Sequence, residues 1–119
     1  MDMGERGGYS MSLDFVIFEK GESTKRTYDL FSRNYTHNVT PMWKLANIYD
    51  ELYNSNGKQP EEVIEKLKKG LEDMQKHPEK YVPLNPLNGW GDYNGAIEFL
   101  EEVIKACENN PESEIYISK

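Results

Sequence analysis

The chain has 119 residues, of which 37% are hydrophobic and 29% charged, and its formal net charge is −7. This length suits one folded domain with its own core and is too short for two. The negative charge argues against nucleic acid or an anionic membrane surface as a partner, because both attract basic protein faces. No apolar run approaches the roughly 20 residues of a membrane-spanning helix. A single cysteine, Cys107, excludes an internal disulfide and favours a reducing, cytoplasmic setting.

Residues 1–10 show no apolar periodicity, which indicates a tail outside the folded domain. Codons for residues 4–8 would be purine-rich, like a bacterial ribosome-binding site, and they end shortly before Met11. We therefore hypothesise that translation starts at Met11 and that residues 1–10 are an upstream extension, with a native flexible tail as the alternative. An intact mass that includes Met1 in natively expressed protein would exclude this start. The domain itself is expected to span residues 11–119.

Two strands are predicted at the beginning of this domain. Residues 12–19 and 26–33 are both rich in β-branched and aromatic side chains, and a glycine-containing turn separates them. This pattern is typical of a β-hairpin. Apolar side chains occupy both faces of the first strand, which predicts that it is the central strand of the sheet.

Three helices are predicted after the hairpin from capping residues and apolar spacing. Each helix has a typical start signal. The first has a hydroxyl residue followed by proline, the second has acidic residues in its first turn, and the third has an aspartate N-cap. The expected helices begin at Thr40, Pro60 and Asp92 and end before residues 54–57, residue 77 and residues 109–111, respectively. In the first of them Trp43 lies off the apolar stripe, and a place in the core is the favoured interpretation.

A long loop over residues 77–91 separates the second and third helices, and it contains three prolines and Trp90. Loops of this length in compact domains are often functional. Residues 114–118 alternate between apolar and polar side chains and form the last expected strand. The order β-β-α-α-α-β predicts an α+β fold in which a small three-stranded sheet packs against three helices.

Two segments, residues 34–38 and 87–93, are rich in amide, hydroxyl, glycine and aromatic groups, and each precedes an expected helix. If consecutive helices pack antiparallel, the first and third helices run parallel and begin at the same end of the domain. We therefore expect both segments to meet at one ligand-binding site. The candidate binding residues are Arg33, Asn34, Tyr35, Thr36, His37, Asn38, Asn88, Gly89, Trp90, Gly91 and Tyr93.

These residue types suit a nucleotide or a nucleotide sugar. Helix N-termini attract phosphate groups, and asparagine amides can read the polar edges of a ligand. Trp90, Tyr93 and Tyr35 could stack on a planar base, while Arg33 could supply a positive charge. The alternative is structural, since asparagine and glycine also build ordinary turns and Trp90 could close the end of the core.

Catalytic and metal-binding patterns are weak. His37 is the one histidine in a suggestive setting, but no serine or cysteine nucleophile motif accompanies it, so a structural role is preferred. The two histidines and Cys107 do not have the spacing of metal ligands. The sequence also lacks a glycine-rich phosphate loop of either standard kind. We therefore predict no catalytic residue, no metal and no cofactor.

Three segments of the sequence carry a family resemblance. Residues 11–15 read Met-Ser-Leu-Asp-Phe, residues 34–38 read Asn-Tyr-Thr-His-Asn, and residues 88–95 read Asn-Gly-Trp-Gly-Asp-Tyr-Asn-Gly. On these motifs, residues 11–119 resemble a family of small, largely uncharacterised proteins encoded by bacteriophages and prophages. The resemblance implies a phage accessory protein rather than a metabolic enzyme or a shell component of the virion.

Together these features suggest a counter-defence protein in the cytoplasm of the infected bacterium. It would bind a nucleotide immune signal, such as an ADP-ribose derivative or a cyclic nucleotide, and sequester it without turnover. A homo-oligomer is expected, because a second subunit often completes such sites. Two alternatives stay open: a small hydrolase of the same signal that uses His37, and an inhibitor that binds a host protein through acidic helical faces. The acidic residues in question include Glu98, Glu101, Glu102 and Glu108.

Overall fold

A three-stranded antiparallel sheet forms one layer of the molecule. The computed structural model describes residues 12–20 and 29–119, so the expected tail over residues 1–10 lies outside the described residues. Strands β2 (Ser12–Phe18), β3 (Phe31–Thr36) and β4 (Glu114–Ser118) are arranged in the order β3-β2-β4. The first strand is therefore central, and the α+β class is confirmed.

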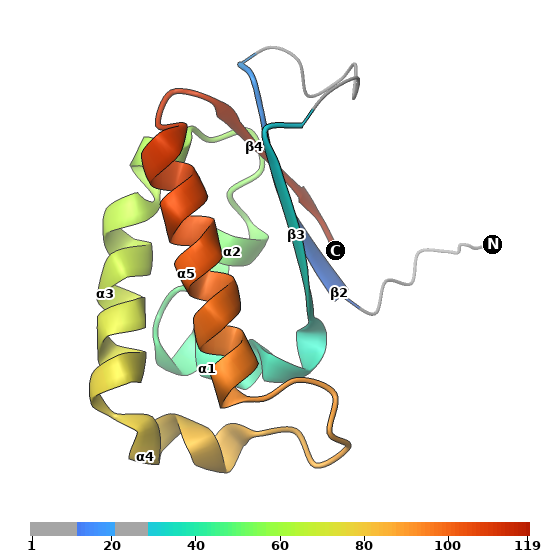
Figure 1. The fold of residues 1–119 in the computed structure, drawn as a ribbon, viewed down its shortest axis with the longest axis vertical. Coiled ribbons are helices and arrows are strands. Elements are labelled where there is room, and N and C mark those ends of the chain that lie inside the picture. The colour runs from blue at the N-terminus through green and yellow to red at the C-terminus, as the bar shows by residue number, and fades with distance from the viewer. Residues whose placement is uncertain (1–11, 21–28) are drawn as a thin grey trace, which may run out of the picture.

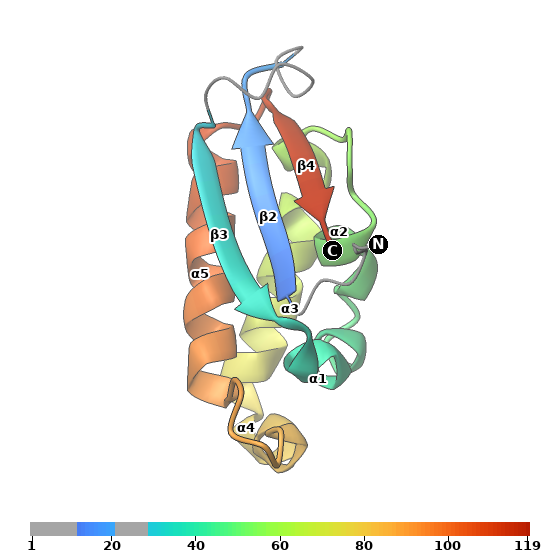
Figure 2. The same ribbon diagram turned by 90° about the vertical axis from the view of Figure 1, so that its right-hand side faces the viewer.

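Helices cover one face of this sheet, as Figure 2 shows. The two longest, α3 and α5, lie side by side and run in opposite directions (Figure 1). No helix within the described ranges is long and apolar enough to cross a membrane. The helices are α1 (Thr40–Leu45), α2 (Tyr49–Tyr53), α3 (Ile64–Lys76), α4 (Pro78–Tyr81) and α5 (Tyr93–Asn109), with 3-10 turns η1 (His37–Val39), η2 (Pro60–Glu62) and η3 (Val82–Leu84).

The core lies between β2 and the two long helices. Phe15 and Ile17 of β2 and Phe99 and Leu100 of α5 are completely buried. Burying a side chain of this size contributes about 1.5–3 kcal/mol. Trp43 is 1% exposed and its ring lies 5.9 Å from that of Phe99, centroid to centroid, so the favoured interpretation of Trp43 as a core residue is confirmed.

The second strand begins and ends later than predicted. The expected range was 26–33, whereas β3 covers Phe31–Thr36, and residues 26–28 lie outside the described ranges. The cause is pairing with β2, which starts at Ser12 and carries the ladder as far as Thr36. Asparagine is a poor strand residue, but neighbouring strands override such intrinsic preferences. Residues 34–36, expected only as part of a polar segment before a helix, therefore belong to the strand.

The first predicted helix is two short helices, α1 and α2. Asn47 has a φ of 63°, a left-handed conformation that ends a helix. Its N–H bonds the carbonyl of Lys44, and the N–H of Ile48 bonds the carbonyl of Trp43. These two bonds form a Schellman motif, which closes α1 before α2 begins at Tyr49.

Proline residues shape the second helix and the long loop. The helix expected from Pro60 starts as the turn η2, where the Gln59 N–H donates to a carboxylate oxygen of Glu62 at 2.8 Å, and α3 proper begins at Ile64. The loop expected over residues 77–91 was predicted without secondary structure. It contains α4 and η3, because Pro78 is well placed at the first position of a short helix.

Candidate functional site

The two polar segments of the sequence meet in the fold. The side-chain Nδ2 of Asn38 donates to the backbone carbonyl of Trp90 at 3.4 Å, across 52 residues of chain. A Cβ placed on Gly91 would lie 2.5 Å from Cγ2 of Thr36, so the Gly91 backbone packs closely on the Thr36 side chain. The segments that precede α1 and α5 are therefore direct neighbours.

Tyr35 holds this arrangement together. Its hydroxyl accepts from the Asp92 N–H at 3.1 Å and donates to the Asp92 carbonyl at 3.3 Å. Its ring stacks on Phe99 of α5, with the ring centroids 5.6 Å apart. Burial raises the pKa of the Tyr35 hydroxyl, so it keeps its proton at neutral pH. Gly95 is required beside it, because a Cβ there would lie 2.2 Å from that hydroxyl.

A pocket of about 400 Å³ opens where the segments meet. Trp90 is 70% exposed although it is the largest apolar side chain of the site. This size is within the range of pockets that hold small molecules. The side chains that line it are Ser12, Asn34, Thr36, Asn38, Asn88 and Trp90.

Hydrogen bonds fix the orientation of the three asparagines. Asn34 donates through Nδ2 to the Ser12 hydroxyl at 2.6 Å and to the Asp14 carboxylate at 3.0 Å. Asn88 accepts the Trp90 backbone N–H on Oδ1 at 2.9 Å. Together with the bond from Asn38 to Trp90, these contacts leave the remaining polar atoms of Asn38 and Asn88 available to a ligand.

Strand alternation separates the candidates of β3 into two groups. Asn34 and Thr36 point to the pocket side of the sheet, whereas Arg33 and Tyr35 point to the helix side. Arg33 forms an ion pair with Glu102 of α5, with Nε and Oε1 2.8 Å apart. Arg33 therefore does not supply the positive charge expected of it, and Tyr35 does not stack on a ligand.

Three further candidates do not line the pocket, namely Tyr93, Gly89 and Gly91. The Tyr93 hydroxyl donates to the Met74 carbonyl at 2.6 Å, which ties α5 to α3 and removes this ring from the pocket. Gly89 and Gly91 have φ values of 77° and 92°, which glycine adopts readily. They shape the loop that presents Trp90.

His37 faces away from the pocket lining, toward α2. Its Nδ1 lies 2.8 Å from the hydroxyl of Tyr53. Burial lowers the pKa of His37, and the nearby carboxylate of Asp14 opposes that shift. The ring of a neutral His37 can accept a hydrogen bond from the Tyr53 hydroxyl, which is a structural role. His77, in contrast, stands at the end of α3, where the sequence predicted it.

The N-terminus of α5 is already capped from within the chain. The Asp92 carboxylate accepts the Gly95 N–H at 2.7 Å, and Oδ1 of Asn85 accepts the Tyr93 N–H at 2.7 Å. These two N–H groups are therefore engaged within the chain and are not offered to a phosphate. The short helix α1 gives no better site, since Thr36 accepts the Asn38 N–H just before it.

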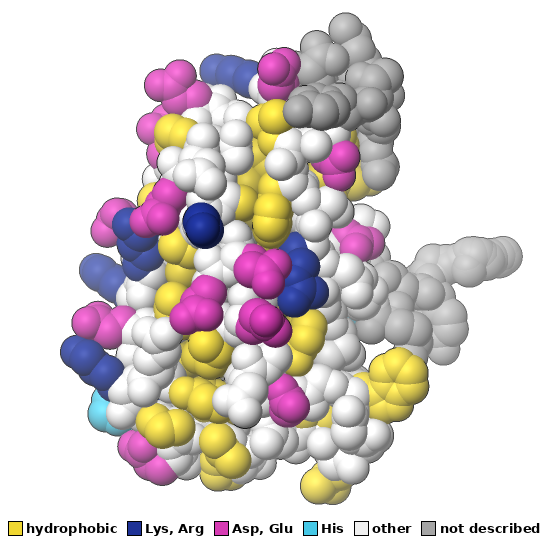
Figure 3. All heavy atoms as spheres, in the orientation of Figure 1, with side chains coloured by type: hydrophobic (Ala, Val, Ile, Leu, Met, Phe, Trp, Pro, Cys, Tyr) yellow, Lys and Arg dark blue, Asp and Glu magenta, His cyan; other side chains and the backbone are white. Residues whose placement is uncertain are grey.

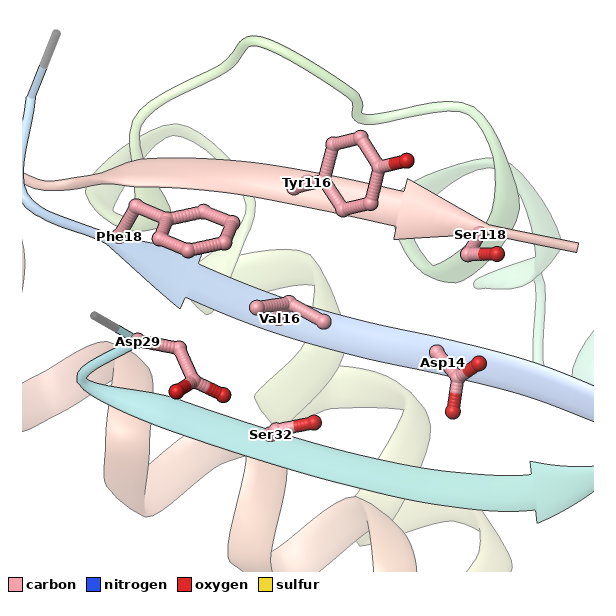
Figure 4. A pocket seen from close by; sticks show the side chains of 7 residues that line it. All are labelled: Asp14, Val16, Phe18, Asp29, Ser32, Tyr116 and Ser118. Atoms are coloured by element: carbon pink, nitrogen blue, oxygen red, sulfur yellow. The ribbon is translucent and has the colours of Figure 1, made fainter. Parts of the chain in front are cut away.

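A second hollow of about 300 Å³ lies on the sheet face opposite the helices (Figure 4). Asp29 and Phe18 stand at one end of the hollow and Asp14 at the other, and the rings of Phe18 and Tyr116 meet edge to face with their centroids 6.1 Å apart. The sequence indicated only that both faces of β2 carry apolar residues, and it did not predict this hollow. It also did not predict that Ser12 lines the first pocket. Both depend on strand pairing.

Within the described part of the chain, the possible metal ligands and the one cysteine are as follows. Residues 12–20 and 29–119 contain no group of three or more His, Cys, Asp or Glu side chains that could hold a metal ion. Cys107 is completely buried, and this burial raises the pKa of its thiol to about 12. Such a thiol stays protonated at neutral pH and is a poor nucleophile.

Comparison with protein-family models, with curated proteins and with solved structures found no match to this chain. The functional interpretation therefore depends on the geometry of the pocket and on the motifs of the sequence.

Proposed function

We propose that this protein binds a small nucleotide-type molecule, such as an ADP-ribose derivative or a cyclic nucleotide, and holds it without turnover. With the resemblance to bacteriophage proteins, the proposed role is counter-defence in the cytoplasm of an infected bacterium, where capture would keep an immune signal from its effector. The observation that carries the proposal is the pocket formed jointly by residues 34–38 and 88–90.

An exposed tryptophan beside several amides is the arrangement that planar, polar ligands favour. Trp90 leaves a large ring surface in contact with water, and Asn38 and Asn88 have polar atoms beside it. Stacking of a base on an aromatic ring contributes about 1–3 kcal/mol, and well-placed amides add specificity. A lipid would need a larger apolar lining than a single ring.

The contacts of His37 support binding rather than hydrolysis. A general base must reach the proton that it removes. His37 is outside the pocket lining, and its Nδ1 is engaged by the Tyr53 hydroxyl. The hydrolase alternative therefore has no positioned base among the described residues that line the pocket.

The acidic helical surface gives the host-protein alternative little support. Glu102 pairs with Arg33, Glu108 pairs with Lys68 at 3.0 Å, and Glu101 accepts from Gln75 at 3.1 Å. Acidic and basic side chains are interspersed over the face that α3 and α5 form (Figure 3). Such a mixed surface is typical of a solvated helical face and has no single-sign patch to guide a partner.

A ligand-release assay tests the proposal and separates the three candidate functions. The protein is mixed with ADP-ribose derivatives and cyclic nucleotides, separated from unbound ligand, denatured by heat, and the released molecule is identified by mass spectrometry. Recovery of intact ligand is the expected result. Altered ligand would indicate an enzyme, and no depletion of any ligand would contradict the proposal. Light scattering on the bound protein tests the proposed homo-oligomer, which a single-chain mass would exclude.

The Trp90→Ala substitution tests the pocket itself. Loss of the stacking surface should weaken ligand affinity by about 10-fold to 100-fold. Leu87→Ala is the matched control, because Leu87 is fully exposed in the same loop and does not line the pocket. Calorimetric titration of both variants should show the loss in Trp90→Ala alone. Equal affinities for the two variants would contradict the proposed site.

A further inference from the structure

We infer that the ligand is recognised as a nucleoside, through a base that presents an N–H donor beside a ring-nitrogen acceptor, as adenine does, while its phosphate groups remain in solvent. This inference rests on the proposed function, because it concerns the same pocket. It follows from the orientation of the amides, from the placement of the charges, and from the position of Asp14.

Backbone groups of Trp90 determine which atoms the neighbouring amides present. The Trp90 N–H can only donate, so Asn88 gives it Oδ1 and retains both N–H donors of Nδ2. The Trp90 carbonyl can only accept, so Asn38 gives it one N–H of Nδ2 and retains Oδ1 as an acceptor. The pocket therefore offers a donor and an acceptor beside one aromatic ring.

This pair of groups complements the edge of adenine. Carboxamides recognise adenine by accepting from its exocyclic amino group and donating to the adjacent ring nitrogen. Asn38 Oδ1 can take the first role and Asn88 Nδ2 the second, while the base lies against the exposed ring of Trp90.

Phosphate groups find no positive partner in the same pocket. No Lys or Arg is among the described residues that line it, and the nearby Arg33 is paired with Glu102 on the other side of the sheet. The N-terminus of α5 is neutralised by the Asp92 carboxylate. The carboxylate of Asp14, which accepts a hydrogen bond from the pocket residue Asn34, places a negative charge beside the pocket. A polyphosphate would therefore gain no charged contact in this pocket and would remain in solvent.

Asp14 is placed to receive the sugar. It is hydrogen-bonded to the pocket residue Asn34 and also lines the hollow on the open sheet face, at the end opposite Asp29 (Figure 4). A carboxylate accepts hydrogen bonds from the paired hydroxyls of ribose, as it does in dinucleotide-binding sites. A base in the first pocket would thus direct its ribose toward Asp14.

Calorimetric titrations with adenosine, AMP and ATP at low and high salt test this inference. The three affinities should agree within about threefold, and salt should change them little, because no charged contact forms. N6,N6-dimethyladenosine, which lacks the amino donors, should bind about 10-fold to 100-fold more weakly. Affinity that rises with each phosphate and falls with salt would overturn the inference and leave the proposed function intact. If neither these compounds nor the ADP-ribose derivatives and cyclic nucleotides bind, both the inference and the proposed function are overturned.

Two aspartate variants test the position of the sugar. Asp14→Asn should weaken adenosine binding about 10-fold, because an amide is a poorer acceptor for two hydroxyls, and the variant still accepts from Asn34. It should bind 2′,3′-dideoxyadenosine as well as the unchanged protein does. Asp29→Asn, at the far end of the hollow, is the matched control and should bind adenosine normally. Equal effects of the two substitutions would overturn the assignment of Asp14.

Discussion

Trp43 and Trp90 occupy opposite environments in this molecule. Trp43 is 1% exposed and packs on Phe99, whereas Trp90 is 70% exposed. The first ring stabilises the fold by burying apolar surface, while the second leaves that surface in water, where burial by a ligand would be favourable. A tryptophan kept in water beside the exposed amides of Asn38 and Asn88 is the residue-scale feature on which the proposed function depends.

Glycine at position 91 is required by both backbone conformation and space. Its φ of 92° disfavours any side chain, and a Cβ would lie 2.5 Å from Thr36 Cγ2. Gly91→Ala should therefore destabilise the fold by about 2–4 kcal/mol, because backbone strain and overpacking combine. Urea denaturation measures this loss.

Gly89 provides the matched control for that substitution. Its φ of 77° is similar, but no atom lies within 4 Å of a Cβ placed there. Gly89→Ala should cost only about 1 kcal/mol from backbone strain. If the two variants are equally stable, the close packing of the 88–91 segment on β3 is wrong.

At the scale of elements, the end of β3 and the start of α5 build the site together. Strand alternation sends Tyr35 to the helix side, where its hydroxyl bonds the backbone of Asp92, and sends Asn34 and Thr36 to the pocket side. The strand therefore uses its two faces differently, one to attach the helix and the other to line the pocket.

The Asp92 cap is expected to stabilise α5 measurably. Its carboxylate accepts the Gly95 N–H at 2.7 Å, and Asp92→Ala leaves this N–H without that partner. The variant should lose about 1 kcal/mol of unfolding free energy. Asp92→Asn retains an acceptor and should lose no more than a few tenths, apart from the helix-dipole contribution. Equal losses in urea denaturation would contradict the cap.

The sequence predicted some elements well because their signals are local. Asp92 followed by a regular apolar stripe defines α5, and clean alternation defines β4. The break at Asn47 was missed, because a single asparagine in an apolar helical pattern does not reveal a left-handed conformation. The shift of β3 was missed because strand limits depend on the partner strand.

The sequence predicted only part of the candidate site, because the rest depends on strand pairing. The meeting of the two segments was expected from helix direction. In the structure the first helix is divided into α1 and α2, and the end of β3 reaches the start of α5 through the Tyr35–Asp92 hydrogen bonds. Residues 34–36 were expected to follow the strand, so strand alternation was not extended to them, and Arg33 was named as a pocket residue. Ser12 was missed because only its pairing with Thr36 brings it there.

At the scale of the whole molecule, the helices cover one face of the sheet (Figure 2). The pocket is lined by side chains from the end of β3 and the start of β2. Asp14 links that pocket to the hollow on the open face. The formal charge of −7 and the absence of Lys and Arg from the described lining favour a ligand bound by stacking and hydrogen bonds rather than by charge.

The most direct test follows the two tryptophan indole N–H signals by ¹⁵N NMR while adenosine or ADP-ribose is added. The Trp90 signal and the side-chain amide signals of Asn38 and Asn88 should shift together and saturate. The Trp43 signal, from the buried core, should stay in place and serves as the internal control. Saturating shifts that spare Trp90 and both asparagines, or no shift with either ligand or with a cyclic nucleotide, would contradict a nucleoside-binding pocket between the two segments.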